Sequence, residues 1–148
     1  MLTPPPLMEG RIRRASPTDA PVLSALEPTA FDGTPTTPDH RTWVIELDGD
    51  LCGFCRTGPS RDPSADVTTT TEIQSFRMHA DHEGRGLGRS LVTWAIDDLR
   101  ERGYVDVTVR VTESDARARR FFEQASFRLD GPADKSEGFA KLPYRLRL

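Results

Sequence analysis

The hydrophobic pattern is most regular in residues 104–111, where valine occupies every second position. Because successive side chains of a strand point to opposite faces, this alternation predicts a half-buried β-strand. In residues 86–102 the apolar residues instead recur at a spacing of about 3.6, and Gly103 follows at a position suited to a helix C-cap. This segment is the clearest predicted helix of the chain.

Shorter patterned runs predict the remaining elements. Asp48-Gly49-Asp50 is a turn signal between two runs rich in strand-forming residues, so these two strands should form a hairpin. Ser16 and Pro17 suit the N-cap and the first position of a helix. The further predicted strands cover residues 11–15, 43–47, 51–56, 67–78, 127–129 and 142–148, and the further predicted helices cover residues 16–26 and 114–124.

In chain order these elements read strand, helix, three strands, helix, strand, helix and two strands. The chain of 148 residues has neither internal repeats nor a linker long enough to separate two domains. We therefore expect one sheet covered by helices, of the α+β (mixed α/β) class. Residues 1–10 are predicted to be a flexible N-terminal segment, and residues 11–148 to form the folded domain.

Composition narrows the class of partner. No apolar run approaches the roughly 20 residues that cross a bilayer, and residues 1–10 lack the features of a secretory signal, so we expect a cytoplasmic protein without a membrane partner. The formal net charge of −3, without long blocks of one sign, argues against binding of nucleic acid. A small-molecule partner is therefore expected.

The only two cysteines, Cys52 and Cys55, have the C-x-x-C spacing of redox and zinc sites. They fall in a predicted strand, where residues three apart point to opposite faces. A zinc site would need two further ligands that the sequence offers poorly. We predict two reduced structural thiols and no metal.

A glycine-rich turn, Glu83-Gly84-Arg85-Gly86-Leu87-Gly88, separates the strand ending at Met78 from the predicted helix. Glycines let the backbone approach an oxygen-rich ligand, and the helix N-terminus favours negative charge. The turn lacks the Lys-Ser/Thr pair of a P-loop, and Leu91 stands where a dinucleotide fingerprint needs its third glycine. An anion site of another kind is indicated.

This turn resembles the Gln/Arg-x-x-Gly-x-Gly/Ala motif of the GNAT superfamily of N-acetyltransferases, which holds the CoA pyrophosphate. Residues 111–127 resemble the family's strand followed by its Asn-x-x-Ala, Tyr and Gly-Phe pattern, and residues 12–20 and 48–54 are similar to its first strand, first helix and second turn. The resemblance covers residues 11–148. It implies the GNAT fold, a mixed sheet of about six to seven strands flanked by about four helices.

The resemblance also implies acetyl-CoA as acyl donor. Four positions depart from the family pattern, since it usually has Gln or Arg, Asn, Tyr and Gly where this chain has Glu83, Asp115, Phe122 and Ser126. The CoA-binding residues that the resemblance implies are Phe76, Arg77, Met78, Glu83, Gly84, Arg85, Gly86, Leu87, Gly88, Arg89, Ser90, Asp115 and Phe122.

By analogy with the family, the backbone N–H near Met78 is the expected donor to the oxyanion. Glu72 lies on the same predicted strand at even spacing, which makes it the candidate catalytic base or, alternatively, a solvated strand carboxylate. Phe122 has no hydroxyl to protonate the departing CoA thiolate, as the family's tyrosine does. Tyr144, Ser114 or water is expected to supply that proton.

Other polar residues have two interpretations. His79 and His82 are acid–base or metal candidates, or exposed loop residues. A run of arginines, Arg117, Arg119 and Arg120, suits the 3′-phosphate of CoA or a solvated helix face. Residues 27–40 and 58–66 should be loops that border the acceptor pocket, because those regions vary with substrate in similar proteins.

The leading hypothesis is an N-acetyltransferase that acts on a primary amine of a small molecule or a peptide. The alternatives are a GNAT-fold protein that binds CoA or a partner without catalysis, and another reaction of CoA thioesters. The resemblance also leads us to expect a homodimer.

Overall fold

The computed structural model describes residues 10–26, 39–82, 84, 86–135 and 138–148. Within these ranges, seven strands and three α-helices confirm the predicted class and order of elements. Apart from Gly10, the predicted flexible segment 1–10 lies outside the described residues. The elements are β1 (Arg11–Arg14), the 3-10 helix η1 (Pro17–Asp19), α1 (Ala20–Leu26), β2 (Arg41–Leu47), β3 (Asp50–Pro59), β4 (Thr70–Met78), the 3-10 helix η3 (Ala80–His82), α2 (Leu87–Glu101), β5 (Asp106–Thr112), α3 (Ala116–Gln124), β6 (Arg128–Leu129) and β7 (Lys141–Arg147).

The strands form one mixed sheet in the order β1-β2-β3-β4-β5-β7-β6. β4 and β5 are parallel, whereas β1 with β2, β5 with β7, and β6 with β7 are antiparallel. The chain divides into two compact units, Met1–Arg56 with Ser75–Ala95 and Thr57–Gln74 with Ile96–Leu148. β3, β4 and α2 therefore each contribute residues to both units. No helix among the described residues is long and apolar enough to cross a membrane.

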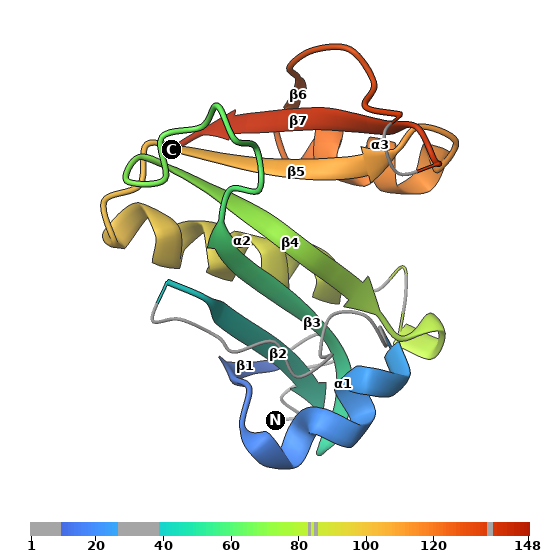
Figure 1. Ribbon diagram of the computed structural model, residues 1–148. Helices are drawn as coiled ribbons and strands as arrows, with labels where there is room; N and C mark the ends of the chain where they lie inside the picture. Colours follow the sequence, from blue (N-terminus) through green and yellow to red (C-terminus); the bar gives the residue numbers. More distant parts are fainter. Residues whose placement is uncertain (1–9, 27–38, 83, 85, 136–137) are drawn as a thin grey trace, which may run out of the picture. The chain divides into compact units, whose positions relative to one another are not determined.

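In the first unit, α1 (blue in Figure 1) packs on the hairpin of β2 and β3. Leu23, Val44 and Phe54 form the buried cluster between them. Asp48 and Gly49, with φ angles of 53° and 83°, make the two-residue turn of the hairpin. Positive φ at both positions is typical of a type I′ turn, which confirms the hairpin predicted from Asp-Gly.

In the second unit, β5 lies between β4 and β7, and α3 packs beside it (Figure 1). Val107, Val109 and Val111 are buried, as their alternation predicts, whereas Val105 precedes β5 and is 39% exposed. β4 begins at Thr70, later than the predicted residue 67, because Asp66 accepts backbone hydrogen bonds from the next turn and so delays the strand.

The first predicted helix starts where expected, but its first turn is the 3-10 helix η1. There Asp19, 8% exposed, accepts from the backbone N–H of Ser16 at 2.7 Å and from both terminal nitrogens of Arg13 at 2.8 and 2.9 Å. The hydrogen bond from Arg13, opposed by burial and assisted by the bond from Ser16, lowers the pKa of Asp19 to about 2.

Because of this lowered pKa, the free energy of unfolding should depend on pH in the acid range. A carboxylate whose pKa falls on folding stabilises the protein above its unfolded pKa, and this contribution is lost as the pH falls through the folded value. We expect Asp19→Asn to lower the free energy of unfolding by about 2 kcal/mol at pH 7. Urea unfolding should show this difference shrinking between about pH 4 and pH 2. A difference that is independent of pH over this range would contradict the assignment.

α3 ends in a Schellman motif whose left-handed residue is not glycine. The N–H of Phe127 bonds to the carbonyl of Phe122 at 3.0 Å, and that of Ser126 bonds to the carbonyl of Glu123 at 3.1 Å. The rings of Phe122 and Phe127 pack with centroids 5.3 Å apart, which completes the motif. Ser126 has a φ of 74°, in the left-handed region, where the β-carbon lies too close to the backbone. This backbone conformation is therefore strained in a residue other than glycine.

Ser126→Gly should therefore raise the free energy of unfolding by about 1 kcal/mol. Chemical denaturation at constant pH measures the change. Gln124→Gly, two residues earlier in regular helix, is the matched control and should destabilise by a similar amount. A loss of stability in both variants would show that no strain is released at Ser126.

Candidate functional site

The turn between β4 and α2 has the strand, turn and helix order that the sequence predicts. β4 ends at Met78, and α2 begins directly after Gly86. Gly84 and Gly86 are exposed and have φ angles of 79° and 77°. Residues with a β-carbon rarely adopt these values, which accounts for glycine at both positions. Glu83 and Arg85, also predicted to bind the anion, lie outside the described residues.

The first turn of α2 follows Gly86 directly. The N–H of Ser90 bonds to the carbonyl of Gly86 at 3.1 Å, and the hydroxyl of Ser90 bonds to the same oxygen at 3.2 Å. Leu87, Gly88 and Arg89 open α2. The positive end of the helix dipole lies at this turn and suits an anion.

Close packing holds this helix end against β4. A β-carbon at Gly88 would lie 3.1 Å from the ring of Phe76 and 3.2 Å from the side chain of Met78. A β-carbon at Gly53 of β3 would overlap the sulfur of Met78. Phe76 and Met78, predicted to contact CoA, thus direct their side chains toward neighbouring glycines.

The predicted site residues are divided between the two units. Residues 76–90 belong to the first unit, and among them Arg77 and Arg89 are exposed whereas the side chain of Leu87 is buried. Residues of the second unit are Glu72, Asp115, Phe122 and Tyr144.

Two of the departures from the family pattern lie in α3 and have local explanations. Asp115 is the N-cap, and its carboxylate accepts from the N–H of Ala118 at 3.0 Å. An asparagine oxygen makes the same bond, so Asp in place of Asn preserves the cap. Phe122 is 4% exposed and packs edge to face on Phe121 and Phe127. Phe122 therefore lies in the core, and its side chain has no hydroxyl.

Tyr144 is 1% exposed, and its hydroxyl already has two partners. It donates to Oε2 of Glu123 at 2.9 Å and accepts from Nε of Arg119 at 3.3 Å. To act as a proton donor elsewhere, Tyr144 would have to give up the bond to Glu123. Arg119, predicted to face solvent or a phosphate, contributes to this network and also donates to the carbonyl of Glu113.

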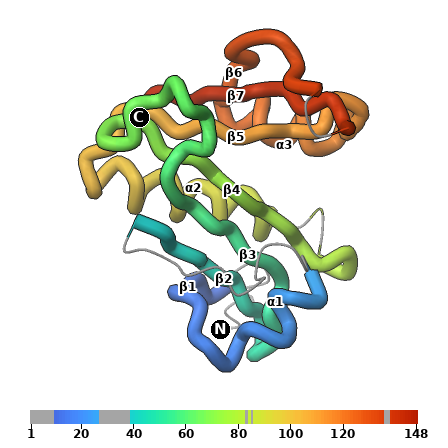
Figure 2. The backbone as a smooth tube through the Cα atoms, in the orientation of Figure 1, coloured from blue at the N-terminus to red at the C-terminus, as the bar shows by residue number. Residues whose placement is uncertain are grey.

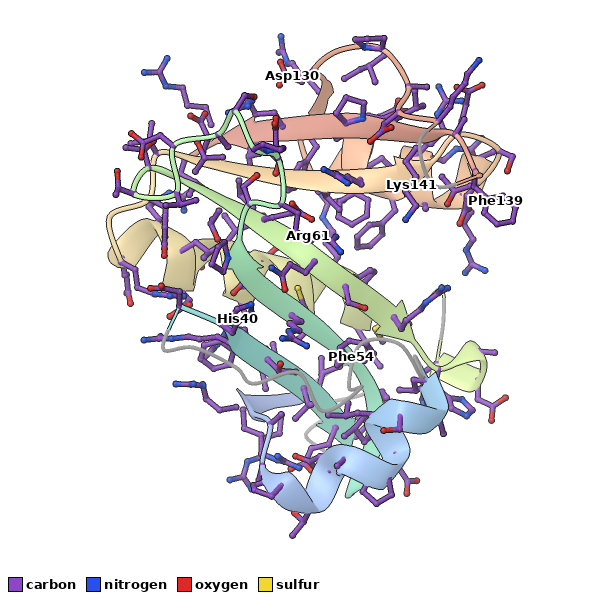
Figure 3. All side chains as sticks on the ribbon, viewed as in Figure 1. His40, Phe54, Arg61, Asp130, Phe139 and Lys141 are labelled. Carbon is purple, nitrogen blue, oxygen red and sulfur yellow. The ribbon has the colours of Figure 1, made fainter. Side chains whose placement is uncertain are left out.

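Glu72 is buried rather than solvated, with a side chain only 1% exposed. Its Oε1 accepts from the backbone N–H of Arg61 at 2.9 Å, and its Oε2 accepts from Nε of Arg61 at 2.8 Å and from a terminal nitrogen at 2.5 Å. Arg61 lies on the connection between β3 and β4 (Figure 3). Sequence reasoning missed this partner, because a lone arginine in a polar connection carries no pattern.

The histidines and cysteines do not form a reactive group. His79 accepts from the N–H of Asp81 at 3.2 Å, and its ring lies 5.9 Å from that of His82. Within the described ranges, no three His, Cys, Asp or Glu side chains gather in a group that fits a metal. Cys52 and Cys55 are buried thiols that are not joined in a disulfide, and burial raises the pKa of Cys55 to about 12. Its thiolate is therefore unavailable near neutral pH.

The unequal burial of Arg61 and Glu72 predicts unequal effects of their removal. Arg61→Ala should cost about 3 kcal/mol or more, because a buried carboxylate loses its counter-ion. Glu72→Gln should cost about 1 kcal/mol, because the half-exposed guanidinium returns to water. Urea unfolding at pH 7 measures both. Arg100→Ala, which breaks an exposed pair with Asp97, is the control and should change stability by less than about 0.5 kcal/mol. Equal losses for Arg61→Ala and Glu72→Gln would contradict the asymmetry.

The similarity of this chain to known proteins covers more than the glycine-rich turn. Residues 12–127 match the model of the Acetyltransferase (GNAT) family. Streptothricin acetyltransferase of Streptomyces lavendulae is 32% identical over 94 residues, which are 63% of this chain and 47% of that protein. Mycothiol acetyltransferase of Beutenbergia cavernae is 41% identical over 88 residues, which are 57% of this chain and 27% of that protein. The chain thus matches less than half the length of either curated relative.

The crystal structure of nourseothricin acetyltransferase is similar to this chain with a TM-score of 0.77 and 26% identity, covering 93% of this chain and 98% of that one. The residues matched by the family model include β4, the glycine-rich turn, α2 and α3. Because the match extends over most of the sequence, the chain belongs to the acetyltransferase (GNAT) family.

Proposed function

We propose that the chain is an N-acetyltransferase that transfers the acetyl group of acetyl-CoA to an amine. The observation that carries this proposal is the turn between β4 and α2, where exposed Gly84 and Gly86 lead into the amides that open a helix. This geometry suits the CoA pyrophosphate that the family binds at the matching motif. The exposed side chains of Arg77 and Arg89 add positive charge to this unit.

In the proposed reaction, acetyl-CoA supplies an acyl group activated as a thioester. The amine nitrogen bonds to the carbonyl carbon, the carbon–sulfur bond breaks, and the amine loses a proton. The N–H of Met78 is the proposed donor to the carbonyl oxygen, where negative charge develops. Glu72 is the proposed acceptor of the proton.

Departure of the thiolate has to proceed without the family's tyrosine hydroxyl, because Phe122 lacks one. A thiol with a pKa of about 8.5 leaves readily as a thiolate, so the missing acid should slow the reaction by about 10²- to 10⁴-fold without preventing it. Water or Tyr144 is the proposed proton source. Since the Tyr144 proton is engaged with Glu123, water is the simpler source.

The names of the matched relatives point to small-molecule acceptors, namely streptothricin, mycothiol and nourseothricin. We propose a small molecule bearing a primary amine as the acceptor, with a peptide amino group as the alternative. Residues 11–148 would form the catalytic domain, and the homodimer expected from the resemblance stays a prediction.

Isothermal titration with acetyl-CoA tests the proposal. We expect wild-type protein to bind with a dissociation constant on the order of micromolar to millimolar, and Gly86→Glu to lose binding at least about tenfold, because it adds strain and negative charge at the turn. Gly49→Glu is the matched control, since its φ of 83° is close to the 77° of Gly86 while it lies in the hairpin turn. Equal loss in both variants, or no binding by the wild type, would contradict the pyrophosphate assignment.

A GNAT-fold protein that binds CoA without catalysis is the second candidate, favoured by the absence of a hydroxyl at Phe122. Thiol release from acetyl-CoA, measured with a panel of primary amines, separates the two functions. Release above the background without enzyme supports the transferase. Binding of acetyl-CoA without release for any amine supports the second candidate.

A further inference from the structure

The ion pair of Glu72 and Arg61 is unequal in exposure. The side chain of Glu72 is 1% exposed, whereas that of Arg61 is 52% exposed. Figure 3 shows Arg61 on the connection between β3 and β4, and Figure 2 follows this connection in green. The guanidinium is therefore the member of the pair that reaches water.

The connection does not depend on the guanidinium for its attachment. The backbone N–H of Arg61 holds Oε1 of Glu72 at 2.9 Å, independently of the side chain. Thr71 donates to the carbonyl of Gly58 at 2.9 Å, and Gln74 donates to the carbonyl of Pro59 at 3.0 Å. The last two bonds hold the end of β3, directly before the connection, on β4 without the guanidinium.

The guanidinium occupies only one part of the carboxylate. Two of its hydrogen bonds go to Oε2, a third goes to the carbonyl of Gln74 at 3.4 Å, and Oε1 is taken by the backbone N–H of Arg61. When the guanidinium leaves, Oε2 becomes an unpaired acceptor in a buried position and requires a cation with N–H groups in its place. Across the part of the chain that the structure describes, Arg61 is the one basic residue that pairs with Glu72.

We infer that the guanidinium of Arg61 competes with the protonated primary amine of the acceptor for Oε2 of Glu72, and that it fills this site until the acceptor arrives. The inference rests on the proposed function, in which Glu72 accepts the proton. The ammonium replaces the guanidinium at Oε2, and one proton then moves from nitrogen to Oε2. The products are a neutral amine and a neutral carboxyl group.

The chemistry of arginine suits a residue that only fills the site. A guanidinium stays protonated at all physiological pH values, so Arg61 neither gives its proton to Glu72 nor becomes a nucleophile. A primary ammonium, with a lower pKa and three N–H donors, can do both. The inferred ligand class is therefore a primary amine, and quaternary ammonium compounds are excluded because they have no N–H to donate.

The experiment follows the thermal midpoint of the full chain and of Arg61→Ala during titration with ethylammonium chloride, without acetyl-CoA. Millimolar guanidinium chloride replaces the missing side chain, and tetramethylammonium chloride controls for charge without N–H donors. We expect ethylammonium and guanidinium each to raise the midpoint of Arg61→Ala saturably. Wild type should need at least about tenfold more, because the tethered guanidinium competes at a high effective concentration.

Arg61→Ala/Glu72→Gln is the matched control and should respond to none of the three salts. Stabilisation of Arg61→Ala by guanidinium alone would overturn the inference, because the site would then fit only its own side chain. An equal response of the double variant would also overturn it. If Arg61→Ala does not fold, Arg61→Gln keeps the backbone N–H and is judged by the same readouts.

The result is separable from the proposed function because no acetyl transfer is measured. If the protein binds ethylammonium at Glu72 but releases no thiol from acetyl-CoA, the transferase function is contradicted and the cation site at Glu72 is supported. If the protein releases thiol but ethylammonium does not stabilise the Arg61→Ala variant, the transferase function is supported and the cation site at Glu72 is contradicted.

Discussion

The packing of α2 against β4 would crowd a β-carbon at Gly88, and the glycine-rich turn lies directly before this close contact. The ring of Phe76 and the side chain of Met78 occupy the space that such a carbon would need. Between β4 and α2 the chain reverses through a turn with left-handed φ angles at Gly84 and Gly86. The positive end of the α2 dipole follows directly, and the proposed CoA site depends on this arrangement.

The buried carboxylates of the two units have different kinds of partner. In the first unit, Asp19 and Arg13 are joined through side chains and a helix start, and the paired carboxylate has a lowered pKa. In the second unit, Glu72 is more deeply buried than Asp19, yet its partner is half exposed and belongs to a surface connection. The first arrangement is suited to stability. The second pairs a buried carboxylate with a half-exposed guanidinium, and the inferred competition at Glu72 depends on this difference.

The substitutions in α3 keep the helix and change its chemistry. Asp115 caps the N-terminus as asparagine would, and Ser126 retains the Schellman motif although its φ favours glycine. Phe122 retains the aromatic packing of its position, including the contact with Phe127, while removing a hydroxyl. The structural demands on this helix are therefore met, and the missing hydroxyl affects only the proposed departure of the thiolate.

The sequence by itself determined the order of elements, the Asp-Gly hairpin, the valine face of β5 and the strand, turn and helix around the glycines. These features depend on residues close together in the chain, so periodicity and turn chemistry reveal them. Only the tertiary structure decided that Glu72 is buried and paired with Arg61, eleven positions away, and that the hydroxyl of Tyr144 binds Glu123, 21 positions away. Such pairs have no signature in the sequence, because the fold of the sheet and α3, rather than chain proximity, brings their side chains together.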